Sequence, residues 1–347
     1  MSAGSLSTEW LEKLWWREAW LTLRAAEPAT LPAWLGSTIR GALGHLWRSS
    51  LCALTQAGNE DDSLSGANCG HECLLPARCP YYSLFENKLE GARSFILIPP
   101  PPPGLEEIAL GGPVVQPYRT SAPGRDESVP SLRCEAEMTF DPGATLRFGL
   151  RLFGPASESL PAVVDALARF GLCLGGYHFQ LAAARDGAGQ LLYDSRFPRI
   201  PVQNVAVTRL GVQAEAPRAI RVVFLSPAIL KLEAAPTFSP ADFAARFFDH
   251  TVGTAARMHQ SCFSERLPWV ELPDLHSRLV GQKLYRYKLR RHSRRQDKWL
   301  DFDGLVGYMD LRGEFGPAMP FARAAEAFHF GQKSALGQGA IRVLTLE

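Results

Sequence analysis

The sequence lacks any uninterrupted apolar run of the roughly 18 residues that a membrane-spanning helix needs. Its first twenty residues carry acids and tryptophans where a secretory signal would have a basic start and an apolar core. Both absences predict a cytoplasmic protein without a membrane partner. In that compartment its seven cysteines are expected to be free or metal-bound rather than joined in disulfides.

A strong net charge is also missing. The 347-residue chain has a formal net charge of only +2, so any surface that attracts nucleic acid must be local. Its 46% hydrophobic content is enough for a substantial core, and its length favours two domains.

Several hydrolase signatures are absent as well. The sequence has no G-x-S-x-G elbow, no H-E-x-x-H pair and no paired carboxylates at useful spacing. Hydrolases of those classes are therefore unsupported.

The C-terminal end of the chain carries the most distinctive pattern. Apolar residues at helical spacing after Pro320 predict a short helix, and alternation after Ala340 predicts a closing strand. A loop with Gly331, Gly337 and Gly339 lies between them. Because glycine lets the backbone approach a ligand closely, the loop suits phosphate binding; a plain flexible turn is the alternative.

A helix, the sequence GQKSALGQG and a final strand resemble the C-terminal signature of the RAMP superfamily of CRISPR-associated proteins. More narrowly, they resemble the endoribonucleases that cut CRISPR repeat RNA into guide RNAs. The stretches RYKLRRHSRRQDKWLDFDGLVGYMDLRG and LPAWLGSTIRGALGHLW resemble the internal hairpin and first helix of that family.

The periodic segments repeat one order, β–α–β–β–α–β. In the first half we expect strands at 16–26, 95–98, 133–140, 145–153 and 177–184, and helices at 31–54 and 157–172. The strands 133–140 and 145–153 are expected to pair through the turn Asp141-Pro142-Gly143. In the second half we expect extended segments at 219–225 and 229–232, a helix from Ser239-Pro240 to about Cys262, a hairpin of 284–291 with 300–311, and the terminal helix and strand.

This pattern predicts an α+β protein, and the resemblance implies tandem ferredoxin-like (RRM-like, RAMP) domains with a C-terminal glycine-rich loop. The expected first domain spans 1–200, with a cysteine-containing insertion at about 52–130. The expected second domain spans 201–347 and holds the basic hairpin and the glycine-rich loop.

The hairpin is the strongest electrostatic feature of the sequence. Between Lys283 and Lys298, eight lysines and arginines in sixteen residues are opposed only by Asp297. Such a concentration favours a phosphate backbone as the partner, whereas the alternative is a solvated edge that discourages aggregation. The candidate RNA-binding residues are Arg286, Lys288, Arg290, Arg291, Arg294, Arg295 and Lys298, together with Gly331, Gln332, Ser334, Gly337 and Gly339 of the loop.

Cleavage of RNA without a metal requires a group that takes or gives a proton near neutral pH, and histidine suits this role. Among eight histidines, His45 is favoured because the family often places its catalytic histidine on or just after the first helix. Arg40, Arg48 and Lys333 are expected to stabilise charge on phosphorus. An ordinary helix-face histidine remains the alternative, and His329 is the next candidate.

The cysteines form a separate cluster. Cys52, Cys69, Cys73 and Cys79 are spaced so that they predict a structural zinc site, with an iron–sulfur cluster as another option and free thiols as the alternative. No cofactor is expected for catalysis.

The resemblance implies an endoribonuclease that binds CRISPR repeat RNA and cleaves precursor crRNA by attack of the 2′-hydroxyl. The products would carry 2′,3′-cyclic phosphate and 5′-hydroxyl ends. One alternative is a non-catalytic RAMP subunit that binds RNA among other subunits of a CRISPR effector complex. Another is a scaffold whose hairpin contacts an acidic protein.

Overall fold

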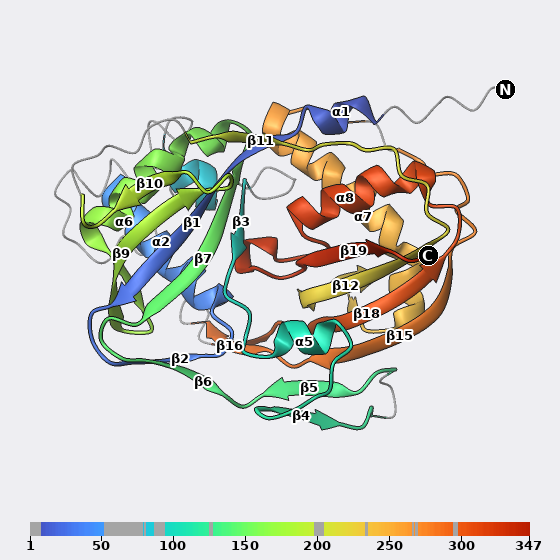
Figure 1. The fold of residues 1–347 in the computed structure, drawn as a ribbon, viewed down its shortest axis with the longest axis horizontal. Helices are drawn as coiled ribbons and strands as arrows, with labels where there is room; N and C mark the ends of the chain where they lie inside the picture. Colours follow the sequence, from blue (N-terminus) through green and yellow to red (C-terminus); the bar gives the residue numbers. More distant parts are fainter. Residues whose placement is uncertain are drawn as a thin grey trace.

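The computed structural model describes residues 8–51, 79, 81–86, 94–124, 128–197, 205–232, 235–265, 267, 270–293 and 298–347. The protein is a mixed α+β structure whose two large sheets stand side by side (Figure 1). Within the described ranges no helix is both long and apolar enough to cross a membrane.

The first sheet is built around β1 (Trp15–Ala25), whose buried and less buried residues mostly alternate along the strand. The hydrogen-bonded order is β10-β9-β1-β7-β3, with β11 beside β1 and β8 beside β9. Its other strands are β3 (Phe95–Ile98), β7 (Thr145–Phe153), β8 (Leu172–Leu174), β9 (Tyr177–Asp186), β10 (Leu191–Asp194) and β11 (Val207–Arg209).

Two helices, α2 (Gly36–Leu51) and α6 (Leu160–Phe170), complete the first core. Leu35, directly before α2, and Ile39, Leu43 and Trp47 within it are buried and recur every four positions, which places one apolar stripe against the sheet. The same core takes in Leu167 and the other buried residues of α6.

The second sheet has the order β19-β12-β18-β15-β5-β4. Its strands are β4 (Tyr118–Ser121), β5 (Ser131–Cys134), β12 (Ala219–Ala228), β15 (Arg278–Tyr287), β18 (Gly304–Arg312) and β19 (Ile341–Thr345). It packs with α7 (Pro240–Phe263) and α8 (Met319–Phe328). The predicted start of α7 is confirmed, because the Ser239 side chain accepts a hydrogen bond from Asp242 N at 3.3 Å.

The two sheets repeat one arrangement. In the first sheet, β1, β3, β7 and β9 are the first, second, third and fourth strands of the β–α–β–β–α–β order. They lie in the sheet in the order 4-1-3-2, as β9-β1-β7-β3. In the second sheet, β19-β12-β18-β15 has the same order. Every neighbouring pair in both sets is antiparallel.

One predicted pairing is wrong. Residues 133–140 do not form a strand that pairs with β7; β3 takes that place. The segment instead divides into β5, which joins the second sheet in parallel with β15, and β6 (Glu137–Phe140), which pairs with β2 (Ala29–Pro32). Leu132 is fully buried in a small core with Tyr287 and Val306. The alternation in this segment reports two extended stretches but does not identify their partners.

The two halves share a buried contact. Phe328 at the end of α8 packs its ring against Trp16 of β1 and Phe153 of β7, with ring centroids 5.8 and 5.4 Å away. Beside them Arg151 of β7 donates a hydrogen bond to Ala327 O at 2.8 Å and is paired with the buried Glu18. This contact fixes the end of α8, where the glycine-rich loop begins.

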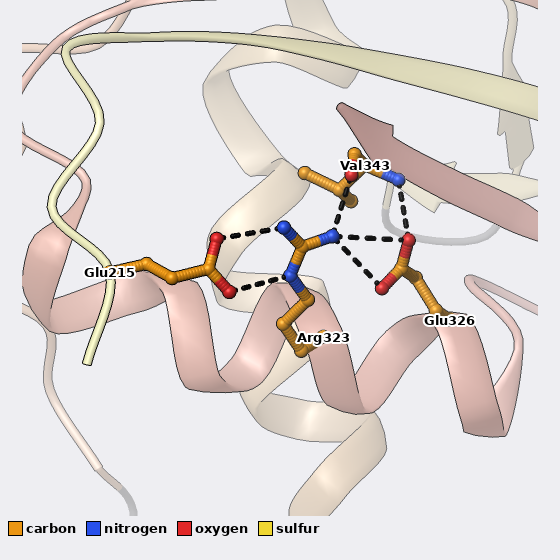
Figure 2. A network of polar contacts seen from close by, with 4 residues as sticks. All are labelled: Glu215, Arg323, Glu326 and Val343. Atoms are coloured by element: carbon orange, nitrogen blue, oxygen red, sulfur yellow. Dashed lines mark hydrogen bonds and ion pairs between the residues drawn. The ribbon is translucent and has the colours of Figure 1, made fainter. Parts of the chain in front are cut away.

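A polar network fixes the other face of α8 (Figure 2). Arg323 donates two hydrogen bonds to Glu215, at 2.9 and 2.7 Å, and another to Val343 O of β19 at 2.6 Å. Glu326 accepts hydrogen bonds from Arg323 and from Val343 N. The network ties the segment before β12, the terminal helix and the terminal strand together, so both ends of the glycine-rich loop are held.

Shorter elements complete the described chain. They are α1 (Glu9–Glu12), the π-helix η3 (Tyr82–Glu86), α5 (Leu105–Ala109), the 3-10 helices η4 (Gly154–Ser159), η5 (Gly316–Ala318) and η6 (Ser334–Leu336), and the small strands β13 (Leu230–Leu232), β14 (Ala235–Thr237), β16 (Arg290–Ser293) and β17 (Lys298–Asp301).

Candidate nucleic-acid interface

The basic hairpin, residues 283–303, extends from the strands β15 and β18 of the second sheet. Its outer part is the two-stranded ladder of β16 and β17, in which Arg290 lies opposite Asp301. The expected hairpin is therefore present, although its two ladders are separate sheets.

Acidic residues neutralise part of this hairpin. Asp303 accepts a hydrogen bond from Arg286 Nε at 3.0 Å and from Leu289 N at 2.9 Å, and Lys288 Nζ lies 3.6 Å from the same carboxylate. Arg290 Nε lies 3.5 Å from Asp301 Oδ1. The count of charges from 283 to 298 ends before Asp301 and Asp303. It therefore overstates the net positive charge of the hairpin.

The remaining hairpin cations are described in part. Lys298 is exposed, and Arg291 lies in β16 with its side chain outside the description. Arg294 and Arg295 lie outside the described residues. Lys283 Nζ donates hydrogen bonds to Gly111 O and Gly112 O, both at 2.8 Å, and so holds a loop against the second sheet.

An exposed tryptophan stands on the same hairpin. The Trp299 side chain on β17 is 57% exposed, and the Arg290 guanidinium lies 5.3 Å from its ring centroid. Large aromatic side chains that remain exposed beside cations are typical of surfaces on which nucleobases stack.

A cavity of about 1290 Å³ lies at the foot of the hairpin. Its walls come from both halves of the protein: the segment before α2 with the first turn of that helix, the segment from β5 to the start of β6, the hairpin and the glycine-rich loop. Thr38, Glu137, Trp299 and Gln338 represent these four walls. The fold therefore gathers the first helix, the hairpin and the loop around one space.

The glycines of the loop are required by close packing. Gly331, Gly337 and Gly339 all have φ near +78°. A Cβ at Gly337 would lie 2.2 Å from Pro99 Cδ, and one at Gly339 would lie 1.8 Å from Phe330 O. A Cβ at Gly36, in the first turn of α2, would lie 1.9 Å from Leu336 O. The loop is thus a close-fitting joint between the two halves.

Several backbone N–H groups of the loop are already used inside the protein. Gln332 N donates to Ile229 O, Gly337 N to Ser334 O, and Gly339 N to Pro227 O. Gln332 and Lys333 are exposed and Ser334 is partly exposed. Lys333 Nζ lies 3.7 Å from the centroid of the Phe302 ring, and partial desolvation of the ammonium group together with the charge of Lys231 lowers the pKa of Lys333.

Helix α2 carries three of the predicted catalytic residues. His45 is exposed and stands seven residues after the cavity-lining Thr38, which is two helical turns, so both lie on one face about 10 Å apart along the axis. Arg48 follows one turn later. The Arg40 guanidinium lies 5.2 Å from the Phe85 ring centroid.

The first half of this structure is the part that a known protein family matches. The family model AF_1859_N, described as an N-terminal domain, matches residues 14–203, which is more than half of the chain. The chain belongs to the AF_1859_N family. The matched residues include α2 with His45, whereas the basic hairpin and the glycine-rich loop lie beyond them.

Solved structures similar to this AF_1859_N protein include those of Cas6 proteins. Thermus thermophilus Cas6 has 15% sequence identity and a TM-score of 0.48, covering 95% of this chain and 99% of that one. A CRISPR associated protein Cas6 has 11% identity and a TM-score of 0.42, covering 96% and 100%. A Cas6-RT-Cas1–Cas2 complex has 12% identity and a TM-score of 0.47, covering 96% of this chain and 29% of that chain. No curated relative matches the chain by sequence.

Two other histidines of the AF_1859_N protein are withdrawn from solvent and are not among the described residues that line the cavity. His329 is 3% exposed and donates from Nδ1 to Gln338 O at 3.1 Å. Burial and the charge of Arg151 lower the pKa of His329 to about 3, so it is neutral at working pH and closed to substrate. His250 is partly buried, and its pKa is lowered by burial and by the charge of Arg257.

The predicted metal ligands are mostly outside the described residues. Cys52, Cys69 and Cys73 all fall there, and Cys79 packs partly buried against the first core. The zinc site stays a prediction.

Several residues at the cavity were missed by reasoning from the sequence, including Glu137, Gln338 and three on the hairpin. Trp299, Asp301 and Asp303 alternate in the segment WLDFD, directly after the basic run. That alternation indicates one strand face opposite the arginines, and it is the signal that would have identified them.

Proposed function

We propose that the two halves, 1–200 and 201–347, are tandem ferredoxin-like domains of an endoribonuclease that binds CRISPR repeat RNA and cuts precursor crRNA. The observation that carries this proposal is the cavity, because its walls come from the first helix, the basic hairpin and the glycine-rich loop. These are the three segments whose sequences resemble the repeat-processing endoribonucleases.

The proposed reaction is an internal transfer at phosphorus. The 2′ oxygen attacks the adjacent phosphorus as its proton leaves, the bond from phosphorus to the 5′ oxygen breaks, and that oxygen takes up a proton. The products carry a 2′,3′-cyclic phosphate and a 5′-hydroxyl. This balance needs an acid and a base but no redox partner and no metal ion.

His45 is the residue we propose as acid or base. It is exposed, and it lies on the same face of α2 as the cavity-lining Thr38, two turns further along the helix. Arg48 lies one turn further along the helix. In the proposed complex its guanidinium binds the RNA phosphate next to His45. Lys333 of the loop contacts the ring of the cavity-lining Phe302, and Arg40 supports the helix through its contact with Phe85.

The test is cleavage of candidate repeat RNAs by purified protein in EDTA, comparing wild type with His45→Ala and His178→Ala. His178 is also exposed but lies on β9, so it is the matched control. We expect cyclic-phosphate ends from wild type and His178→Ala, and loss of cleavage with retained binding in His45→Ala. Cleavage by all three proteins would move the catalytic role elsewhere. Binding without cleavage by wild type would contradict the enzyme.

A second candidate is a non-catalytic RNA-binding subunit of a CRISPR effector complex. One observation favours it: among the described residues that line the cavity there is no histidine. This candidate predicts that wild type retains repeat RNA stably, without cleavage, and co-purifies with other subunits of such a complex.

Zinc at Cys52, Cys69, Cys73 and Cys79 is a separate proposal. Metal analysis of the purified protein is expected to give one zinc per chain, and removal by a chelator should lower the melting temperature while cleavage in EDTA persists at a permissive temperature. Iron in place of zinc would favour the iron–sulfur alternative. The absence of both metals would leave the thiols free.

A further inference from the structure

The charges that line the cavity are balanced. Its cationic side chains are Arg133, Arg286, Lys288 and Arg290, and its anionic side chains are Glu135, Glu137, Asp301 and Asp303. Ion pairs link Arg286 and Lys288 to Asp303 and Arg290 to Asp301. Binding of a phosphate backbone draws on cations in excess, and this wall does not supply them.

The cavity also has one large aromatic side chain, Trp299, that is exposed and open to a ligand. Trp299 is 57% exposed on β17, and it is a diagonal cross-strand neighbour of Arg290, which lies opposite Asp301. The Arg290 guanidinium lies 5.3 Å from the indole centroid, so it restrains the ring from the hairpin side. A ring placed and restrained in this way offers a stacking platform to a planar group.

Two other walls of the cavity carry hydrogen-bond acceptors, one exposed and one buried. Glu137 is exposed at the start of β6 and makes no ion pair with any residue of the described chain. On the loop wall, Gln338 is fully buried, its Nε2 donates to Phe302 O at 2.7 Å, and its Oε1 has no hydrogen-bond partner among the described residues. Carboxylate and amide oxygens accept hydrogen bonds from the exocyclic amino groups of bases.

Size agrees with a ligand larger than a single small molecule. Typical small-molecule pockets have volumes of about 300–1,000 Å³, whereas this cavity has about 1290 Å³. It therefore has room for an unstacked base together with part of its neighbours on a strand.

We infer that the cavity reads an unpaired base bearing an exocyclic amino group, stacked on Trp299 with Glu137 as the acceptor, within single-stranded RNA. This inference rests on the proposed function and assigns the cavity to base recognition, leaving the phosphates to exposed cations outside it. Cytosine should then bind more tightly than uracil, because uracil has a carbonyl oxygen where cytosine has the amino group.

The test measures binding of single-stranded oligo(C) and oligo(U) of equal length over a range of salt concentrations. Proteins to compare are wild type, Trp299→Ala, Glu137→Ala and Phe170→Ala. Phe170 is 58% exposed at the end of α6 and does not line the cavity, so it controls for loss of an exposed aromatic ring. Circular dichroism and melting temperature establish that each variant is folded.

We expect oligo(C) to bind wild type and Phe170→Ala more tightly than oligo(U). Trp299→Ala should weaken oligo(C) binding by about 5- to 150-fold, the range for loss of one base-stacking ring, with an unchanged dependence on salt. Glu137→Ala should bring oligo(C) binding to the level of oligo(U).

Equal binding by wild type and Trp299→Ala would overturn the inference. If repeat RNA is still cut in that case, the proposed function stands without it. Failure of wild type both to bind and to cut any RNA would instead remove the proposed function, and the inference with it.

Discussion

Arg286 and Asp303 face one another across the foot of the basic hairpin, with Arg286 Nη2 2.9 Å and Nε 3.0 Å from Asp303 Oδ2. The carboxylate is largely buried and also receives the Leu289 N–H. This pair turns a residue expected to hold RNA into one that holds the hairpin, and it leads to the first prediction.

Replacement of Asp303 should strengthen phosphate binding while weakening the fold. Asp303→Ala removes a carboxylate with charged hydrogen bonds, so the free energy of unfolding should fall by about 1–3 kcal/mol. Arg286 and Lys288, no longer paired with this carboxylate, should steepen the salt dependence of single-stranded RNA binding by about 0.7 per added phosphate contact. Denaturant titration and binding at several salt concentrations measure the two effects. An unchanged salt dependence would contradict release of the cations.

The pair of Glu215 and Arg323 should make stability depend on acid pH (Figure 2). Its hydrogen bonds with Arg323 lower the pKa of Glu215 below the usual value of 4.5. A carboxyl group whose pKa is lower in the folded state than in the unfolded state stabilises the fold at pH values above its unfolded pKa. This contribution is lost as the pH falls through the folded pKa. Wild type should therefore lose more stability than Glu215→Gln below about pH 4.5.

Melting temperatures from pH 6 down to pH 3 measure this difference. Glu135→Gln is the control, because Glu135 pairs with Arg119 in an exposed bridge that is expected to contribute little. Identical acid profiles for wild type and Glu215→Gln would show that the network does not stabilise the fold.

His329 should produce a second dependence on pH, in a different range. Its pKa is about 3 in the folded protein because the ring is buried beside Arg151, whereas an unfolded histidine has the ordinary value of 6.5. Between these values the unfolded chain binds the extra proton, so stability falls as pH decreases from 6.5, by up to about 1.4 kcal/mol per pH unit.

Replacement of His329 by asparagine tests this prediction. Asparagine does not titrate, and at this position, where φ is 61° and ψ is 148°, it carries the same backbone strain as the histidine that it replaces. Between pH 6.5 and 4.5 the free energy of unfolding should change less steeply with pH in His329→Asn. The difference in slope should correspond to up to one proton, or about 1.4 kcal/mol per pH unit. Equal slopes would mean that the native protein accepts a proton on His329.

The glycine-rich loop should not tolerate a side chain at its joint. Gly339→Ala would place Cβ 1.8 Å from Phe330 O, so it should prevent folding or strongly lower the melting temperature. Gly176 also has a positive φ, +99°, but no atom lies within 4 Å of its Cβ position. Gly176→Ala should therefore cost only the conformational strain, about 1–2 kcal/mol. Equal effects of the two substitutions would contradict a packing role for Gly339.

Much of the local structure follows from the sequence. The Ser239-Pro240 pair fixed the start of α7 because an N-cap and a proline act within one helical turn. The apolar periodicity around Leu43 and the alternation along β1 gave a helix and a strand for the same reason: each depends on neighbours a few residues away. The basic hairpin and the glycine-rich loop are also local patterns.

The tertiary structure alone decided which segments meet. Asp303 neutralises Arg286 although it lies beyond the basic run, and Leu132 carries β5 to the second sheet instead of to β7. Leu336 of the loop meets Gly36 of α2, three hundred residues earlier, and so closes a cavity that neither segment forms alone. Such contacts depend on the shape and charge of distant surfaces, which periodicity along the chain does not encode.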